Sequence, residues 1–165
     1  MNTIDFAKYN LNSSTGWAMG LINDMRDQPL AQPTSAGGNH PLWVLGHITY
    51  AESNLLDGFI LGQPNRFPEL AEQFDQGTTP TADAGAYPSM DELMGKFDAI
   101  RAATLAHLDT LSEEDLDKPS HAPEEMKQFF GTVGACYSAM AVHIAFHAGQ
   151  VADARRAAGK GPMMG

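Results

Sequence analysis

The stretch Val142-His143-Ile144-Ala145-Phe146-His147-Ala148-Gly149-Gln150-Val151 lies in the last long segment of the chain that contains no proline. Its two histidines are four residues apart, so on a helix both imidazoles lie on one face, one turn from each other. A single metal ion can bind both of them in that arrangement. On spacing alone, however, two ordinary histidines on a half-exposed helix face are the better interpretation.

The surroundings of these histidines favour a metal site. The run Ala139–Ala148 contains no Asp, Glu, Lys or Arg, and His47 lies in a similar apolar stretch at 42–48. An imidazole buried among apolar side chains needs a hydrogen bond or a ligand to offset its desolvation. One shared ion accounts for all three residues, so the sequence predicts a metal site formed by His47, His143 and His147.

Outward from this stretch, apolar side chains recur every three to four residues in four segments, which is the pattern of helices. The predicted helices cover residues 3–26, about 41–61, 89–111 and 132–158. In the first, the recurring residues are Phe6, Tyr9, Trp17, Leu21 and Met25. Asn39 is expected to cap the second helix, and Ser89 begins a capping-box spacing at the third.

The segments between these helices are rich in proline, glycine and polar residues, at 28–38, 63–88 and 112–130. The connection 63–88 is too long for a simple hairpin and is expected to cross over the bundle. No strand pattern or internal repeat is found. The sequence therefore predicts an all-α four-helix bundle in one domain over residues 1–160, with 161–165 as a flexible tail.

Composition limits the partners of this chain of 165 residues. Ten Lys and Arg against 20 Asp and Glu give a net charge of -10, which repels nucleic acids and anionic membranes. A small molecule or a protein remains as the expected partner.

The single cysteine, Cys136, suits a reducing compartment, and neither a signal peptide nor a membrane span is recognised. A cytoplasmic location is expected.

The remaining candidate residues carry less information. Tyr50 and Gln150 each follow a metal-site histidine by three residues and could lean toward the ion, although packing or orienting roles explain them equally well. His40, at the start of the second helix, is too far from His47 to share the ion comfortably. His107 and His121 receive no role, and Cys136 is interpreted as a small buried hydrophobic residue.

The segments Asn39–His47 and His143–Val151 resemble the two signature segments of the DinB superfamily. Phe74–Pro80 and Tyr87–Ser89 resemble its crossover, and the similarity extends from Phe6 to Lys160. The resemblance implies an up-down-down-up four-helix bundle, frequent homodimers, and a metal held by one histidine of the second helix and two of the fourth. Those positions are His47, His143 and His147.

Three histidines with an otherwise open coordination sphere match the catalytic type of metal site. DinB-like proteins include isomerases and S-transferases that use low-molecular-weight thiols. The expected function is therefore that of a metal-dependent thiol S-transferase, or of a related hydrolase or isomerase. The alternative is a non-catalytic, metal-stabilised bundle with a stress-related binding or structural role. Zinc or nickel is the first expectation for the ion, with iron or manganese as alternatives, because imidazole binds all of them.

Overall fold

The computed structural model describes residues 1–34 and 38–163. The predicted loop at 28–38 and the predicted tail at 161–165 therefore lie partly outside the described residues. Four long helices dominate the chain: α1 (Thr3–Asp24), α2 (Pro41–Ser53), α4 (Met90–Leu108) and α6 (Val133–Ala157). The described ranges contain no strand, and one isolated bridge joins Pro119 to Thr132. The prediction of an all-α fold is confirmed.

Shorter helical segments fill the connections. A π-helical segment, Asn54–Ile60, continues α2 to the point where Gly62 adopts a positive φ of 64°. The crossover carries α3 (Ala71–Phe74) and the 3-10 turns Pro68–Leu70 and Ala84–Ala86. The last connection carries α5 (Lys127–Phe130) and the 3-10 turns Glu114–Asp117 and Glu124–Met126. Among the helices described, none is both long and apolar enough to cross a bilayer.

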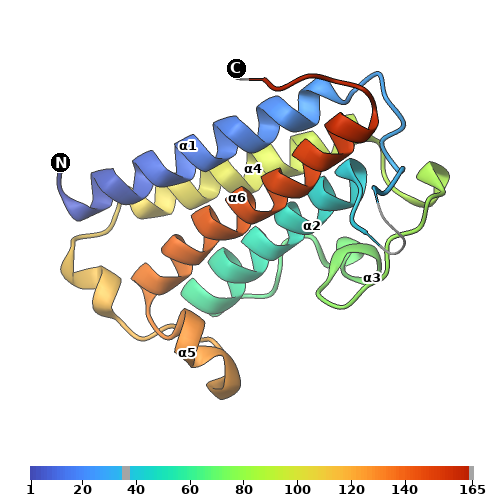
Figure 1. Ribbon diagram of the computed structural model, residues 1–165. Coiled ribbons are helices and arrows are strands. Elements are labelled where there is room, and N and C mark those ends of the chain that lie inside the picture. The colour runs from blue at the N-terminus through green and yellow to red at the C-terminus, as the bar shows by residue number, and fades with distance from the viewer. Residues whose placement is uncertain (35–37, 164–165) are drawn as a thin grey trace.

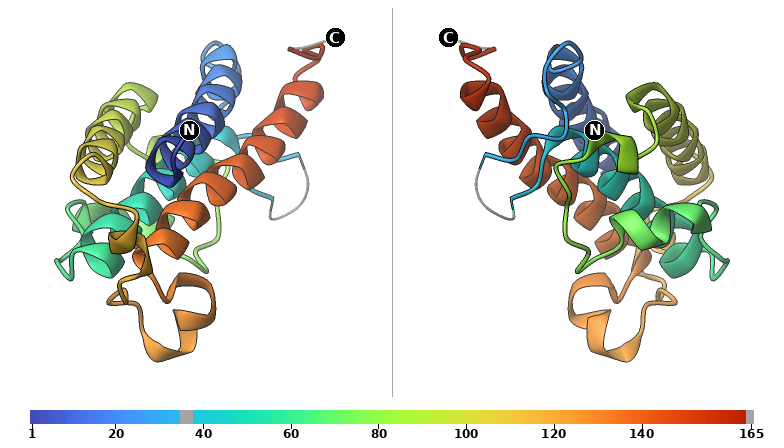
Figure 2. Two further views of the ribbon diagram at one scale, coloured as in Figure 1. Left: turned by 90° about the vertical axis from the view of Figure 1, so that its left-hand side faces the viewer. Right: turned by 90° about the vertical axis from the view of Figure 1, so that its right-hand side faces the viewer.

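The long helices lie roughly alongside one another (Figure 1). Helices α1 and α6 run in one direction, and α2 and α4 run in the other. Helix α6 packs against both α1 and α2, and α2 also packs against α4. The end-on views place α1 between α4 and the C-terminal half of α6 (Figure 2). This arrangement brings the histidine face of α6 toward α2.

Side-chain caps fix where the helices begin. Ser89 Oγ accepts a hydrogen bond from the amide of Glu92, as the capping-box spacing predicted, and Thr132 caps α6 in the same way. The prediction for α2 is wrong by one residue. His40, not Asn39, is the N-cap, and its Nδ1 accepts from the amide of Trp43 at 3.1 Å. An imidazole nitrogen supplies the same acceptor that an Asn side chain would.

The spacing of apolar residues in α1 predicted a helix correctly, but several of these residues face outward. Phe6, Tyr9 and Trp17 are 55%, 62% and 61% exposed. The face of α1 that packs on the other helices is formed by smaller or aliphatic residues, namely Ile4, Leu11, Ala18 and Ile22. Helix α1 therefore carries apolar side chains on two faces, and among the described residues only one of these faces is covered.

The crossover packs on the outer side of α2. Phe74 is fully buried, and its ring lies directly over Gly46, where any side chain would overlap the ring. The indole Nε1 of Trp43 donates to the carbonyl of Gln73 at 3.0 Å. His40 Nε2 lies 2.9 Å from the carbonyl of Thr81. These contacts hold the crossover beside the first two turns of α2, where His47 is located.

Candidate metal centre

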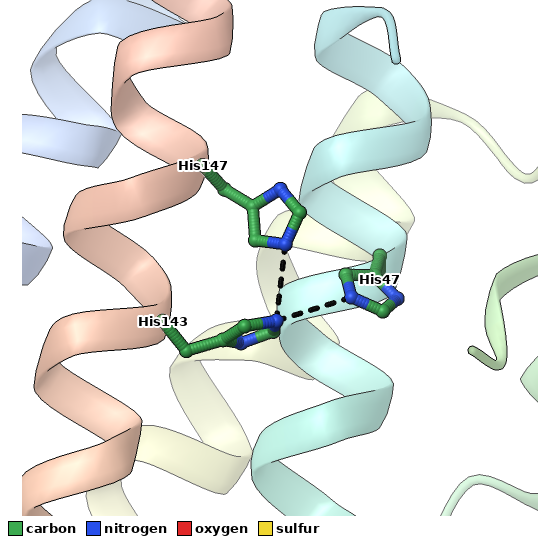
Figure 3. A group of neighbouring side chains, drawn as sticks. All are labelled: His47, His143 and His147. Atoms are coloured by element: carbon green, nitrogen blue, oxygen red, sulfur yellow. Dashed lines mark hydrogen bonds between the residues drawn. The ribbon is translucent and has the colours of Figure 1, made fainter. Parts of the chain in front are cut away.

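The three histidines predicted to share an ion are brought together by the fold. His47 projects from α2, and His143 and His147 project from successive turns of α6, so that their Nε2 atoms converge (Figure 3). The Nε2 of His143 lies 3.1 Å from that of His47 and 3.0 Å from that of His147. Side chains 96 positions apart in the sequence thus meet at one point.

Two of the rings are oriented by hydrogen bonds from their other nitrogen. His47 Nδ1 donates to the carbonyl of Phe74 at 2.7 Å, and His147 Nδ1 donates to Oε1 of Gln150 at 2.8 Å. A carbonyl or amide oxygen can only accept, so the ring proton of each histidine resides on Nδ1. Both Nε2 atoms therefore carry a lone pair that points to the centre of the cluster.

The orientation of Gln150 is itself fixed. The Nδ2 of Asn39 donates to the same Oε1 at 3.1 Å, which places the amide oxygen of Gln150, and not its NH2 group, toward His147. Asn39 thus acts at the centre through Gln150, even though it does not cap α2. A chain of two amides joins the residue before the N-cap of α2 to a histidine of α6.

The donor set fits a divalent ion. The Nε2 lone pairs of His47 and His147 are both acceptors, and the Nε2 of His143 can donate at most one proton. That proton can satisfy only one of the two acceptors, so hydrogen bonds alone leave the cluster unsatisfied. Three nitrogens at 2.0–2.1 Å from a tetrahedral zinc ion would be about 3.3 Å apart. The two separations that involve His143, 3.0 and 3.1 Å, are within a few tenths of an ångström of that value, and all three nitrogens lie within 4.8 Å of one another.

Burial keeps the cluster neutral. Removal from water lowers the pKa of all three imidazoles below 6.5, to about 3 for His143 and about 4 for His147. The positive charges that His147 and His47 would carry lower the pKa of His143 further. For His147, the hydrogen bond to Gln150 raises the pKa in part, and the charge that His47 would carry lowers it. For His47, the Phe74 carbonyl and the Asp75 carboxylate act in the opposite direction. Neutral imidazole is the form that binds metal ions.

Aromatic side chains pack against two of the three histidine rings. The indole of Trp43 stacks on the His47 ring at 4.5 Å between centroids and an interplanar angle of 11°. Phe146 meets His147 edge-on at 5.2 Å, although most of its own ring is exposed. These rings limit the approach of water from two sides, so an ion here would sit in a low-dielectric setting.

A family profile for the DinB superfamily matches residues 18–151. The chain belongs to the DinB superfamily. Among curated proteins, none matches this sequence. The matched region begins in α1 and ends in α6, and it includes all three histidines. The resemblance inferred from the histidine segments is thereby confirmed, and metal binding is general in this superfamily.

Of the two weaker candidates in this DinB-superfamily chain, Tyr50 and Gln150, the structure places Gln150 beside the candidate metal centre. Gln150 contacts His147 directly. Tyr50 is buried and packs in the core, and no hydrogen bond in the described structure joins it to a histidine. The Nδ1 of His107 lies 2.6 Å from the hydroxyl of Tyr137, and His121 is exposed. Cys136 is fully buried, and this burial raises the pKa of its thiol to about 11.

Sequence reasoning did not identify the groups that orient the histidines. The carbonyl of Phe74 and the Asn39 amide are the clearest examples. A backbone carbonyl leaves no signal in sequence, because every residue has one. Asn39 did leave a signal, since it lies in the segment that resembles the family, but its position before Pro41 is equally typical of a helix cap.

Proposed function

We propose that this DinB-superfamily protein binds one divalent metal ion through His47, His143 and His147 and uses it with a low-molecular-weight thiol. The reaction would be an S-transfer, or a related hydrolysis or isomerisation. The convergence of the His47 and His147 Nε2 atoms on that of His143, at 3.1 and 3.0 Å, carries the proposal. Family membership and an all-α fold with a long crossover support an up-down-down-up four-helix bundle of the same kind.

The chain's own residues supply orientation and exclusion of water. Phe74 and Gln150 hold His47 and His147 in the tautomer whose Nε2 can bind a cation, and Asn39 holds Gln150. Trp43 and Phe146 shield the rings on which they pack. A divalent ion held by these three histidines would leave coordination positions open, where the pKa of a bound thiol or water would be lowered and a substrate carbonyl polarised. Zinc or nickel suits three imidazoles, and iron or manganese would be the next to test.

One observation favours a second candidate, a metal-stabilised protein without catalysis that serves a binding or structural role. Within the described residues, no carboxylate, lysine or tyrosine forms a hydrogen bond with any of the three histidines, and the carboxylate that influences His47 belongs to the exposed Asp75. General acid–base catalysis needs a group within hydrogen-bond reach of the reacting atoms. In such a protein, the ion would only link α2 to α6.

Elemental analysis of tag-free protein tests the metal site. After dialysis without chelator, we expect about one equivalent of metal in the wild type. The His143→Ala variant should lose it, whereas His121→Ala, which removes an exposed histidine outside the cluster, should keep it. Failure of the wild type to bind zinc, nickel, iron or manganese would disprove the proposal. Thiol-dependent turnover of electrophiles by the loaded wild type separates the two candidates, since the non-catalytic protein would show none.

A further inference from the structure

All ten basic side chains of this protein form ion pairs with carboxylates. Each Lys and Arg lies within the described ranges, and each contacts an Asp or Glu side chain. Carboxylates and phosphates of small molecules are commonly bound by Arg or Lys side chains. In the described structure, every basic side chain already has a carboxylate partner, so none is free to bind an anionic group of a substrate.

Two arginines adjoin the elements of the metal centre, and both are paired with buried carboxylates. Arg66, at the start of the crossover, donates from Nε and Nη2 to the two carboxylate oxygens of Asp57, at 2.9 and 2.6 Å. Arg101 of α4 donates to the carboxylate of Glu52 on α2 at 2.7 Å. Asp57 and Glu52 are both buried. If either arginine turned toward a substrate, a buried carboxylate would lose its partner, which is strongly destabilising.

The elements that form the metal centre contain no basic residue. Lys and Arg are absent from α2, from residues 67–95, which include most of the crossover, and from residues 128–154, which include most of α6. Residues 67–95 instead carry acidic side chains, namely Glu69, Glu72, Asp75, Asp83, Asp91 and Glu92. The carboxylate of Asp75 acts on the centre, because it raises the pKa of His47. No Lys or Arg in the described structure shifts the pKa of the three histidines.

From this charge distribution we infer that the thiol and the electrophile used at the metal centre carry no carboxylate or phosphate, and are uncharged or cationic molecules. The inference rests on the proposed function, since it names the class of molecules that would meet at the ion. Three neutral imidazoles add no charge to a divalent ion, so one thiolate and the Asp75 carboxylate together would balance it. A further anionic group on either substrate would find no cationic partner.

The charge of the whole chain acts in the same direction. A domain of this size has a radius of about 20 Å, and its net charge is -10. With a Debye length of about 8 Å, such a charge lowers the concentration of a monovalent anion at the protein surface about threefold. Each carboxylate on a substrate therefore weakens binding by about that factor, and no local contact compensates for the loss.

A pair of matched thiols tests the inference. N-acetylcysteine amide and N-acetylcysteine differ only in an amide against a carboxylate. Cobalt-loaded protein reports thiol binding without turnover, because a thiolate bound to cobalt gives a charge-transfer absorption band. Expressed per thiolate, we expect the amide to bind at least about threefold more tightly at physiological ionic strength, and the difference to shrink in high salt.

The outcomes separate this inference from the proposed function. Equal or tighter binding of N-acetylcysteine would overturn the inference and leave the proposed function standing, since a thiol would still bind the ion. If neither thiol produced a charge-transfer band in the cobalt-loaded protein, the proposed use of a thiol would itself be wrong, and the inference would fall with it.

Reversing one charge beside the centre provides the variant. At about 10 mM ionic strength, Asp75→Lys should reduce the preference for the amide about threefold, because charges about 10 Å apart are then weakly screened. Asp98→Lys is the matched control, since Asp98 is also exposed but lies on α4. It changes the net charge equally and should leave the preference nearly unchanged. If the preference were the same in both cobalt-loaded variants as in the wild type, charge near the centre would not set it, and the inference would be overturned.

Discussion

At the scale of single residues, Gln150 has a role that can be separated from metal binding itself. Its Oε1 accepts the Nδ1 proton of His147 and is held in place by Asn39. Losing such an outer partner typically costs a metal site 10–100-fold in affinity. We therefore expect Gln150→Leu to weaken zinc binding by about that factor in a competition titration with a chelating dye.

Gln128→Leu is the matched control for this titration, because Gln128 is exposed on α5 and distant from the histidines. Gln150→Glu should retain most of the affinity, since its carboxylate also accepts the Nδ1 proton. Equal affinity of Gln150→Leu and the wild type would show that Gln150 only packs beside His147.

The residue scale is also where the sequence was most informative. The three histidines stood out because imidazoles in apolar helical segments need a partner. Their orienting groups were harder to find. Phe74 contributes a backbone carbonyl, and Asn39 reaches Gln150 across the gap between α2 and α6, so both depend on tertiary structure. Local patterns predict ligands better than they predict the groups that hold the ligands.

At the scale of elements, the contact between α2 and the crossover controls the position of the Phe74 carbonyl. A methyl group at Gly46 would overlap the buried Phe74 ring. Gly46→Ala should therefore displace the crossover and lower the free energy of unfolding of the metal-free protein by about 1–3 kcal/mol, as overpacking generally does. It should also weaken metal binding, because the acceptor of the His47 proton moves with the crossover.

Urea unfolding of the metal-free variants measures this effect. Gly95→Ala provides the control, since Gly95 lies within α4 with no neighbouring atom near its missing side chain. That substitution should be neutral or stabilise the protein by up to about 1 kcal/mol, following helix propensity. If Gly46→Ala is as stable as Gly95→Ala, the packing of Phe74 on α2 is not tight.

Element boundaries were largely predictable, but the covered face of α1 was not. The predicted helix at 3–26 is observed at Thr3–Asp24, and Ser89 and Thr132 cap the helices that follow them. In α1, however, the smaller apolar residues face the core and the large aromatics face outward. Both sets recur with helical spacing, and no charged residue in 9–23 distinguishes the two faces. Periodicity alone could not choose between them.

At the scale of the whole molecule, the neutral histidines make stability depend on pH. Their folded-state pKa values, about 3 for His143 and about 4 for His147, are below the ordinary value of 6.5. Between these folded-state values and 6.5, the unfolded chain binds more protons than the folded chain, so the free energy of unfolding falls as the pH falls. From pH 7 to pH 5, one such histidine reduces the free energy of unfolding by about 2 kcal/mol.

Urea unfolding at pH 7, 6 and 5, with chelator present, tests this dependence. His143→Gln removes one titrating group and should lose less stability across the same interval than the wild type. His121→Gln should behave like the wild type, because His121 is exposed. Parallel pH dependence in the wild type and His143→Gln would contradict the prediction.

The hydrogen bond from His47 to the Phe74 carbonyl also has a kinetic consequence. His143 and His147 are carried by a single helix of 25 residues, whereas the orientation of His47 depends on a connection that contains only short helical turns. Segments of that kind open locally at a lower free energy than long packed helices do. The residence time of a bound ion would then be set by how often the crossover opens, and not by global unfolding of the chain.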